Sequence, residues 1–244
     1  MVEPFMRHAS CFADFMSASS QFDASAADPG LYGLGPQNLA DSGLSSVGLV
    51  RRILELEGRI YSVEAHGHVG SALQWAPVFE ASPDSWGALT NAADDVVAYW
   101  RIEALEPLAF DRALAGLLDP FDIHPRDCES LAAPGVHDVY IVRNCIDPAW
   151  CEMSTRRIFA DSFFAAAERL ALCGVRFGQT VAVAHSDDEC RLCEDLGLSF
   201  LHDAPDDAGV FGGSFAKALL RLGPELARKR PKLVQAYLPN ARIG

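Results

Sequence analysis

The sequence predicts a mixed α/β fold in which a central sheet is flanked by helices, and three observations support this. The segment 137–174 changes from a run of β-branched and aromatic residues to a helical repeat. A second strand-like run and a second helical segment follow over 179–196. An apolar run at 95–105 is a clear strand, and 137–146 is expected to pair with it antiparallel.

The central unit of the chain is a strand that leads into a helix. Residues 139–146 are rich in β-branched and aromatic residues and stop at Asp147, because the following proline cannot continue a ladder. Ser154 or Thr155 is expected to cap the helix, which Gly174 ends. The apolar positions of this helix recur at spacings of three and four: Ile158, Phe159, Phe163, Ala166, Ala167, Leu170 and Ala171.

The amino end of this helix is a predicted anion site. Exposed amides and the positive end of a helix dipole favour an anion, and Arg156 and Arg157 add full positive charge there. A phosphate group fits this description. The strand and helix then repeat, since 179–184 is a second short strand and Ser186 with Glu189 forms a capping box that opens a helix ending at Gly197.

Further elements are predicted on both sides of this unit. An amphipathic helix spans 47–61, and 83–91 is expected to form a second helix because a proline opens it. A helix or loop over 108–118 and an acidic irregular stretch over 119–136 interrupt two adjacent strands, and covering an acceptor pocket is one role for such an excursion. After Phe200, a helix within 210–222 and a final strand within 231–238 complete the prediction. Residues 1–46 are expected to be a flexible or loosely attached leader, and 47–244 the folded domain.

Composition restricts the classes of function. A formal net charge of -13 argues against a protein that binds the phosphate backbone, so no nucleic-acid partner is expected. No apolar run is long enough to span a bilayer, and no membrane partner is expected. Seven cysteines without regular spacing favour a reducing cytoplasmic location. A homodimer is left open.

The order of these elements resembles the central and C-terminal part of the GNAT superfamily of acyl-CoA N-acyltransferases, over roughly 96–200. Ile146-Asp147-Pro148 matches a strand ending V-x-P, and 194–200 matches the later Y-x-x-L-G-F motif. The resemblance implies a mixed, mostly antiparallel sheet flanked by helices. It also implies an acyl-CoA substrate, acetyl-CoA or another, and an amine acceptor on a small molecule or peptide.

The resemblance places the CoA site at the central strand, the following turn and the start of the second helix. The implied binding residues are Cys145, Ile146, Ser154, Thr155, Arg156, Arg157 and Ser186. The family's Q/R-x-x-G-x-G/A positions fall on Cys151, Ser154 and Arg156, so both glycines that let the backbone approach a phosphate are replaced. In the family a tyrosine usually acts as the general acid, and its position falls on Cys193 here. The Cys193 thiol is therefore a candidate donor of a proton to the leaving thiolate.

Amine acylation also needs a base and a group that polarises the thioester carbonyl. The resemblance assigns polarisation to the backbone amides of the strand that ends at Ile146. Glu103 is the candidate base, with His137 or Asp138 as alternatives, and Tyr140 is a candidate hydrogen-bond donor into the cleft. Acids at strand ends are commonly solvated, and tyrosines inside strands commonly belong to the core.

A metal site is not expected. Cys190 and Cys193 form a C-x-x-C without a second pair of ligands at zinc spacing, and His66 and His68 lie in a glycine-flanked stretch that is typical of an exposed loop. The sequence therefore predicts an N-acyltransferase. Three alternatives stay open: a GNAT-fold binding or sensor protein without catalysis, an enzyme similar to acyl-homoserine-lactone synthases that uses acyl carrier protein, and an effector or interaction protein whose leader over 1–46 is the functional address. The second is suggested by the likeness of 150–156 to a W-E-x-S-R-F strand.

Overall fold

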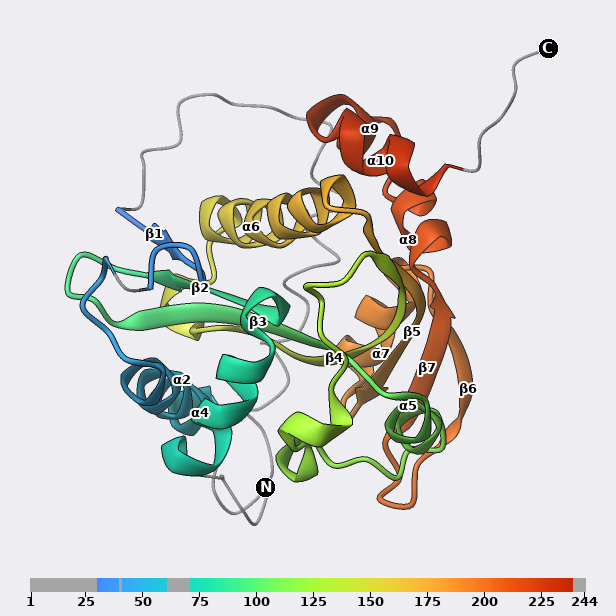
Figure 1. The fold of residues 1–244 in the computed structure, drawn as a ribbon, viewed down its shortest axis with the longest axis horizontal. Coiled ribbons are helices and arrows are strands. Elements are labelled where there is room, and N and C mark those ends of the chain that lie inside the picture. Colours follow the sequence, from blue (N-terminus) through green and yellow to red (C-terminus); the bar gives the residue numbers. More distant parts are fainter. Residues whose placement is uncertain (1–29, 40, 61–70, 239–244) are drawn as a thin grey trace.

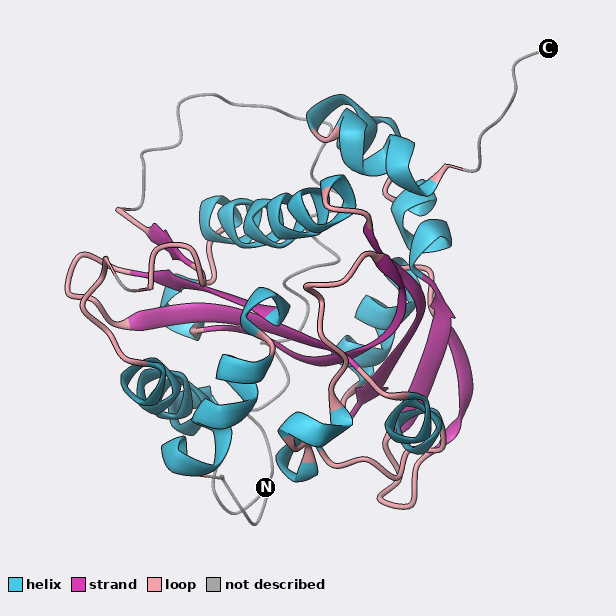
Figure 2. Cartoon of the chain, in the orientation of Figure 1, coloured by secondary structure: helices cyan, strands magenta, loops and turns pink. Residues whose placement is uncertain are grey.

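The computed structural model describes residues 30–39, 41–60 and 71–238 (Figure 1). Helices and strands alternate along most of this length (Figure 2). The strands are β1 (Tyr32–Leu34), β2 (Trp86–Thr90), β3 (Val96–Ala104), β4 (Gly135–Ile146), β5 (Val175–Ala184), β6 (Ser199–Asp203) and β7 (Gly209–Ser214). The helices are α2 (Ser46–Ile60), α4 (Ala72–Ala81), α5 (Pro107–Leu114), α6 (Met153–Leu172), α7 (Asp187–Asp195), α8 (Phe215–Arg221), α9 (Gly223–Lys229) and α10 (Pro231–Tyr237).

The described strands form one seven-stranded sheet in the order β1-β2-β3-β4-β5-β7-β6. All neighbouring strands run antiparallel except β4 and β5, which are parallel. The predicted fold class, a mixed and mostly antiparallel sheet flanked by helices, is confirmed. The predicted antiparallel pairing of the strand at 95–105 with that at 137–146 is also confirmed, as β3 with β4.

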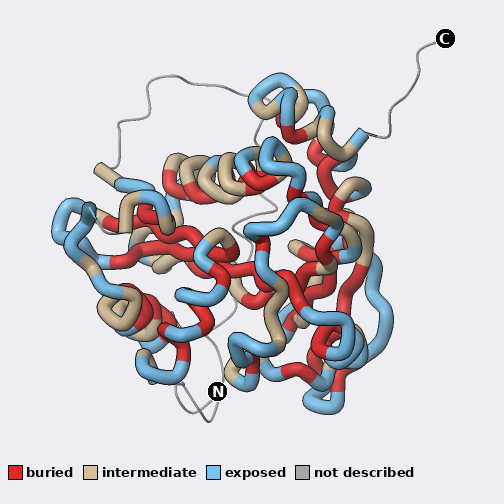
Figure 3. Tube along the Cα trace, viewed as in Figure 1, coloured by how far each residue is buried: buried red, intermediate tan, exposed pale blue. Residues whose placement is uncertain are grey.

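Helices cover both faces of the sheet. In Figure 1, α6 lies on one face of the strands, while α2 and α4 lie on the other. All nine residues of β3 are buried, as expected of a strand that is covered on both sides (Figure 3). Trp100 and Ile102 pack in the core that contains α6, whereas Tyr99, the residue before Trp100, packs in the core that contains α2. The alternation of side chains along β3 therefore separates an α6 face from an α2 face.

The helix predicted after the central strand is present as α6, but its start differs from the prediction. The N-cap is Glu152, and Ser154 and Thr155 lie inside the first turn, so the prediction that one of them caps the helix is wrong. The short 3-10 turn over Pro148–Trp150 brings the chain to helical geometry earlier than the side-chain signal suggested. The capping interaction predicted for α7 is present, because Ser186 accepts a hydrogen bond from the Glu189 amide.

Three predicted elements are corrected by the structure. Residues 83–91 form a 3-10 turn and the buried strand β2 instead of a helix, because pairing with β3 overrides the proline start signal. The helix α4 lies earlier, at 72–81, with Ser71 as N-cap. The first part of 210–222 belongs to strand β7, and 231–238 contains helix α10 where a strand was predicted. The apolar face of α10 buries Leu233 against the core of α6.

The division into a leader over 1–46 and a domain over 47–244 remains an expectation. Within that leader, Tyr32–Leu34 pairs with β2 as an edge strand. Residues 1–29 and 61–70 lie outside the described residues, and so do His66 and His68. Within the described chain, no helix is both long and apolar enough to cross a membrane.

Candidate functional site

The strands β4 and β5 separate part-way along their length. Their parallel pairing runs to Ile141 opposite Ala182, after which β4 continues to Ile146 without β5 beside it. The last residues of β5 remain paired with β7 instead. The sheet therefore opens between its two central strands, and one side of β4 is left as an edge over its last residues.

The backbone of β4 directs two residues toward this opening. Asp147 donates its backbone N–H to the Val97 carbonyl at 2.8 Å. Asp147 and Cys145, two residues before it, are therefore the positions of β4 that form hydrogen bonds with β3. In an antiparallel ladder, alternate residues point their N–H and C=O away from the partner strand. Asn144 and Ile146 occupy those positions, so their backbone groups point toward the gap between β4 and β5. No other strand of the described chain pairs with this side of β4.

A bulge lies at the point where the strands separate. Arg101 pairs with Arg143, but the next residue of β3, Ile102, pairs with Ile141, so Val142 is the extra residue on β4. Such a bulge bends the strand and re-aims the residues that follow it. The bend and the end of β4–β5 pairing therefore fall within two residues of each other.

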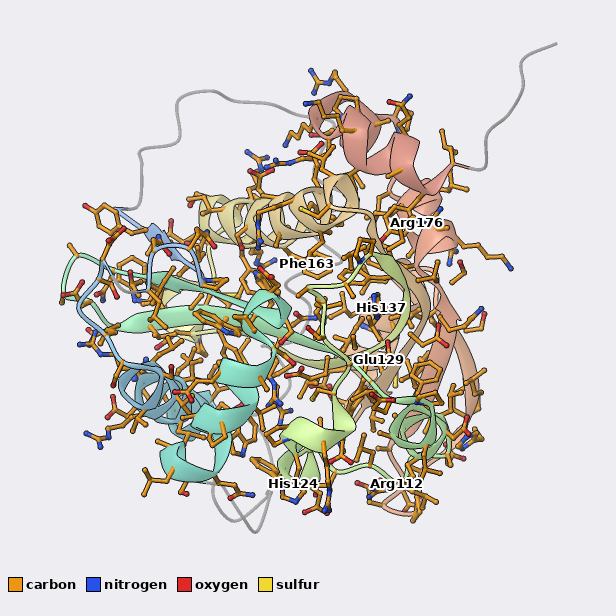
Figure 4. The ribbon with its side chains drawn as sticks, viewed as in Figure 1. Arg112, His124, Glu129, His137, Phe163 and Arg176 are labelled. Carbon is orange, nitrogen blue, oxygen red and sulfur yellow. The ribbon has the colours of Figure 1, made fainter. Side chains whose placement is uncertain are left out.

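An apolar pocket lies beside this opening on the α6 face. Its floor is formed by Ile102 and Ile141, with Asn144 and Thr180 as the polar residues among its lining. Phenylalanines of α6 line one wall, including Phe163, which Figure 4 labels. The empty volume is about 550 Å³ when the solvent at the mouth is included. Thr180 is 2% exposed, and its Oγ1 has no hydrogen-bond partner among the described residues.

One face of α6 contains both a buried residue of its first turn and the phenylalanines of the pocket wall. Thr155, Phe159 and Phe163 are spaced by four residues and so share one side of the helix, about 12 Å from first to last. Thr155 is 1% exposed, and its Oγ1 also has no hydrogen-bond partner in the described part of the chain. Arg156 and Arg157 follow in the first turns.

This helix start fits a phosphate in some respects and opposes it in others. Backbone amides, an unpaired buried hydroxyl and two arginines favour an anion. The carboxylate of Glu152 at the N-cap disfavours a second negative charge, and Ser154 and Arg156 occupy the positions where the resemblance implies glycine. Four of the predicted cofactor residues are consecutive in the chain and lie together in the first turns of α6: Ser154, Thr155, Arg156 and Arg157.

The remaining predicted cofactor residues have separate environments. Cys145 is buried on the α2 face, whereas Ile146 packs partly against the core of α6. Ser186 is exposed and caps α7 at the end of β5. It lies beyond the last residue of the strand that borders the opening.

The two predicted catalytic residues on the central strands are brought together. Glu103 and Tyr140 face each other across β3 and β4, so their side chains lie on the same side of the sheet, away from α6. Both are buried. Burial raises the pKa of Tyr140 to about 12.

Glu103 is fully buried and forms an ion pair with Arg101, at 2.7 Å between Oε1 and Nε. The side chains of Ser85 and Cys128 lie within hydrogen-bonding reach of this carboxylate. The Arg101 guanidinium is stacked over the ring of Trp75, with 4.6 Å to the ring centroid. Burial raises the pKa of Glu103, although the neighbouring Arg101 lowers it in part.

The third predicted catalytic residue lies on the opposite face. Cys193 of α7 packs against Ala182 and Ala184 of β5, in a small core that Ile141 also touches. It is 6% exposed, and burial raises the pKa of its thiol to about 12. The thiol is therefore protonated at neutral pH, and it releases its proton about a thousandfold less readily than an ordinary cysteine.

The alternative bases His137 and Asp138 are held at the other end of β4. His137 Nδ1 lies 2.6 Å from the Glu129 carboxylate, and the two residues are labelled side by side in Figure 4. Asp138 accepts a hydrogen bond from the Gln179 amide at 2.7 Å. From His137 to Asn144 the strand extends for roughly 20 Å. The structure does not bring these two residues to the opening.

Sequence reasoning missed a buried acid on the α2 face. Glu57 of α2 is 3% exposed, accepts a hydrogen bond from the Tyr99 hydroxyl, and lies 3.4 Å from Arg143 of β4. Burial, followed by the nearby Glu57, raises the pKa of Tyr99 well above its ordinary value. The available signal was a charged residue inside the apolar stripe of a helix. Among the described residues, no group of three histidine, cysteine or acidic side chains is arranged to hold a metal ion.

No protein-family model matches the sequence, and no curated protein matches it either. Solved structures are similar in fold at low identity. Naa50 from Arabidopsis thaliana, in complex with the bisubstrate analogue CoA-Ac-MVNAL, shares 11% identity over 76% of this chain and 99% of its own, with a TM-score of 0.42. A GNAT-family acetyltransferase from Listeria monocytogenes shares 10% identity over 75% and 93%, with a TM-score of 0.39.

A third similar structure is Ard1 from Thermoplasma volcanium, with 8% identity over 75% of this chain and 95% of its own and a TM-score of 0.39. All three TM-scores lie below 0.5. At these identities the likeness concerns the fold alone.

Proposed function

We propose that this protein transfers an acyl group from a CoA thioester to the amine of a small molecule or peptide. The observation that carries the proposal is the separation of β4 and β5. It presents the N–H groups of Asn144 and Ile146 next to an apolar pocket. An extended, amide-containing chain can add to such an edge in the manner of a strand.

In the proposed reaction, a neutral amine attacks the thioester carbonyl carbon, the new N–C bond forms and the C–S bond breaks. The amine loses one proton and the departing thiolate gains one, so the exchange is balanced. A backbone N–H on the open edge is suited to polarise the carbonyl, because it is fixed by the sheet and needs no reorganisation. The phosphates of the donor are assigned to the start of α6, with Thr155 and Arg156.

The amine is assigned to the α2 face, opposite the pocket. Glu103 is the proposed base because its side chain faces this side of the sheet and because burial raises its pKa. A base works best when its pKa is close to the operating pH. Tyr140, across the ladder, is a proposed hydrogen-bond donor. Cys193 is not assigned the proton for the thiolate, because its own pKa of about 12 makes that transfer unfavourable.

The binding step can be tested at a single backbone group. Ile146→Pro removes the N–H that points to the opening, while the ladder hydrogen bonds of β4 to β3 involve its neighbours. Isothermal titration with acetyl-CoA is expected to show about fivefold weaker binding, the worth of one hydrogen bond. Ile146→Ala is the matched control, since it truncates the side chain but keeps the N–H. Equal affinity of the two variants would remove the edge from the binding model.

The catalytic step is tested by incubating the protein with acetyl-CoA and three amine probes, and quantifying free CoA by mass spectrometry. The probes are spermidine, lysine and a peptide with a free amino terminus. Amine-dependent release that Glu103→Gln abolishes supports the reaction.

A second candidate is a binding or sensor protein of the same fold. Glu152 at the helix cap and the complete burial of Glu103 favour it. Tight CoA binding without turnover would decide for it. Turnover only with acyl carrier protein as donor would instead decide for the carrier-dependent alternative.

A further inference from the structure

We infer that the donor carries an apolar acyl chain of several carbons, and that this chain occupies the pocket between α6 and α8. The inference rests on the proposed function, because it assigns the acyl end of the same donor.

The pocket is bounded by one continuous face of α8. Phe215, Ala218, Leu219 and Leu222 follow each other at spacings of three, one and three, which places all four on one side of that helix. Phe159 and Phe163 of α6 line the same pocket, and the ring centroids of Phe163 and Phe215 lie 6.3 Å apart. Phe163 packs edge-on against Trp100, with 5.3 Å between the ring centroids, so a neighbouring aromatic ring holds this wall in place.

The position of the pocket matches the acyl end of a thioester on the open edge. Ile141 is the last residue of β4 that pairs with β5, and Asn144 directs its backbone to the gap. Both residues also line the pocket. A carbonyl that is polarised at this edge would have its acyl chain at the pocket floor, and the chain can continue toward α8.

The chemistry of the lining distinguishes an acyl chain from the pantetheine arm. Pantetheine contains two amides, and a buried amide without hydrogen-bond partners is costly. The side chains that line the pocket are apolar apart from Asn144 and Thr180. The open backbone of β4 therefore suits the amide-containing arm, and the phenylalanine-lined pocket suits hydrocarbon.

The size of the pocket also exceeds what an acetyl group fills. The cavity volume is about 40 Å³, which is room for roughly three water-sized groups. Protein interiors are otherwise close-packed, since an unfilled space forfeits contacts on its lining. With the carbonyl held at the edge of β4, the single methyl group of an acetyl chain would fill only part of this space.

The test is a chain-length series by isothermal titration with CoA, acetyl-CoA, butyryl-CoA, hexanoyl-CoA and decanoyl-CoA. Each methylene buried in the pocket is expected to strengthen binding by about fourfold, so that hexanoyl-CoA, with four more methylenes, would bind roughly two hundredfold more tightly than acetyl-CoA if all four are buried. The gain should stop at the length that fills the pocket.

Two variants on α8 locate the effect. Ala218→Phe places a ring inside the pocket and is expected to remove the gain beyond butyryl-CoA. Leu220→Phe is the matched control, because Leu220 is 57% exposed on the same helix and does not line the pocket. The affinities of this variant for the series of thioesters should equal those of the wild type. The series on the unmodified protein is informative even if Ala218→Phe does not fold.

The outcomes separate the inference from the proposed function. If all thioesters bind with equal affinity, or if Ala218→Phe is folded and keeps the full gain, the acyl chain does not occupy this pocket and the inference is wrong, whereas the proposed function stands. If neither CoA nor any thioester binds, the proposed function itself fails. Increasing affinity that Ala218→Phe flattens and Leu220→Phe preserves supports both.

Discussion

The hydroxyl of Thr180 is expected to destabilise the protein in the absence of a ligand. Thr180 is 2% exposed and its Oγ1 has no hydrogen-bond partner among the described residues. Valine has nearly the same shape, so Thr180→Val removes the hydroxyl without opening a cavity. A buried polar group without a partner costs about 1–3 kcal/mol, and we expect the variant to be more stable by an amount near the lower end of that range.

The assay is urea unfolding followed by tryptophan fluorescence, with the free energy of unfolding taken by linear extrapolation. Thr90→Val is the matched control. Thr90 also lies in a strand and is 7% exposed, but its hydroxyl donates to the Tyr32 carbonyl at 3.4 Å. That variant loses a hydrogen bond and should be neutral or less stable, by up to about 1 kcal/mol.

The reasoning would be refuted if Thr180→Val were as destabilising as Thr90→Val. Such a result would mean that the Thr180 hydroxyl has a partner, for example an ordered water in the pocket. In that case a ligand entering the pocket would have to replace the water. If the variant is more stable and also binds hexanoyl-CoA with unchanged affinity, the hydroxyl faces the pocket without contacting the donor.

Three further predictions concern other parts of the chain. Because burial raises the pKa of Glu103, the stability that its protonated form contributes is present below the unfolded pKa of about 4.3 and is lost as pH rises through the folded pKa. The free energy of unfolding of the wild type, relative to that of Glu103→Gln, should therefore decrease as the pH rises from the unfolded pKa to the folded pKa. A difference that does not change with pH would contradict the raised pKa. Gly87→Ala places a Cβ 2.6 Å from Trp100 Cζ2 and should cost about 1–3 kcal/mol in urea unfolding, whereas Gly33→Ala, with nothing within 4 Å, should cost less. Cys193→Ala should change kcat by less than about threefold, and a loss of a hundredfold would restore the thiol as the proton donor.

Local patterns predicted the elements whose signals are long and regular. The helix over 153–172 carries five turns of apolar repeat, and the strands at 96–104 and 135–146 are long runs of β-branched and aromatic residues. Short segments were ambiguous because the same residues suit either conformation. Residues 86–90 became a strand because the edge of β3 was available to pair with them.

The candidate site divides in the same way. The proposed anion site at the start of α6 depends on residues that are close in sequence, so the sequence could place Thr155 and Arg156 together. The pocket depends on Ile102, Thr180 and Leu219, which are far apart in the chain and share no motif. Glu57 could have been suspected, since an acid within an apolar helical stripe has to be buried with a partner.

The sequence by itself determined the order of strands and helices around the central unit, because hydrophobic periodicity and helix termini are local properties. It also determined which charges gather at the start of α6. Only the tertiary structure decided that β4 separates from β5 after Ile141, and that α8 closes a pocket beside that opening. Strand pairing and helix packing join residues that are distant in sequence, and no local signal records which distant residue will be the neighbour.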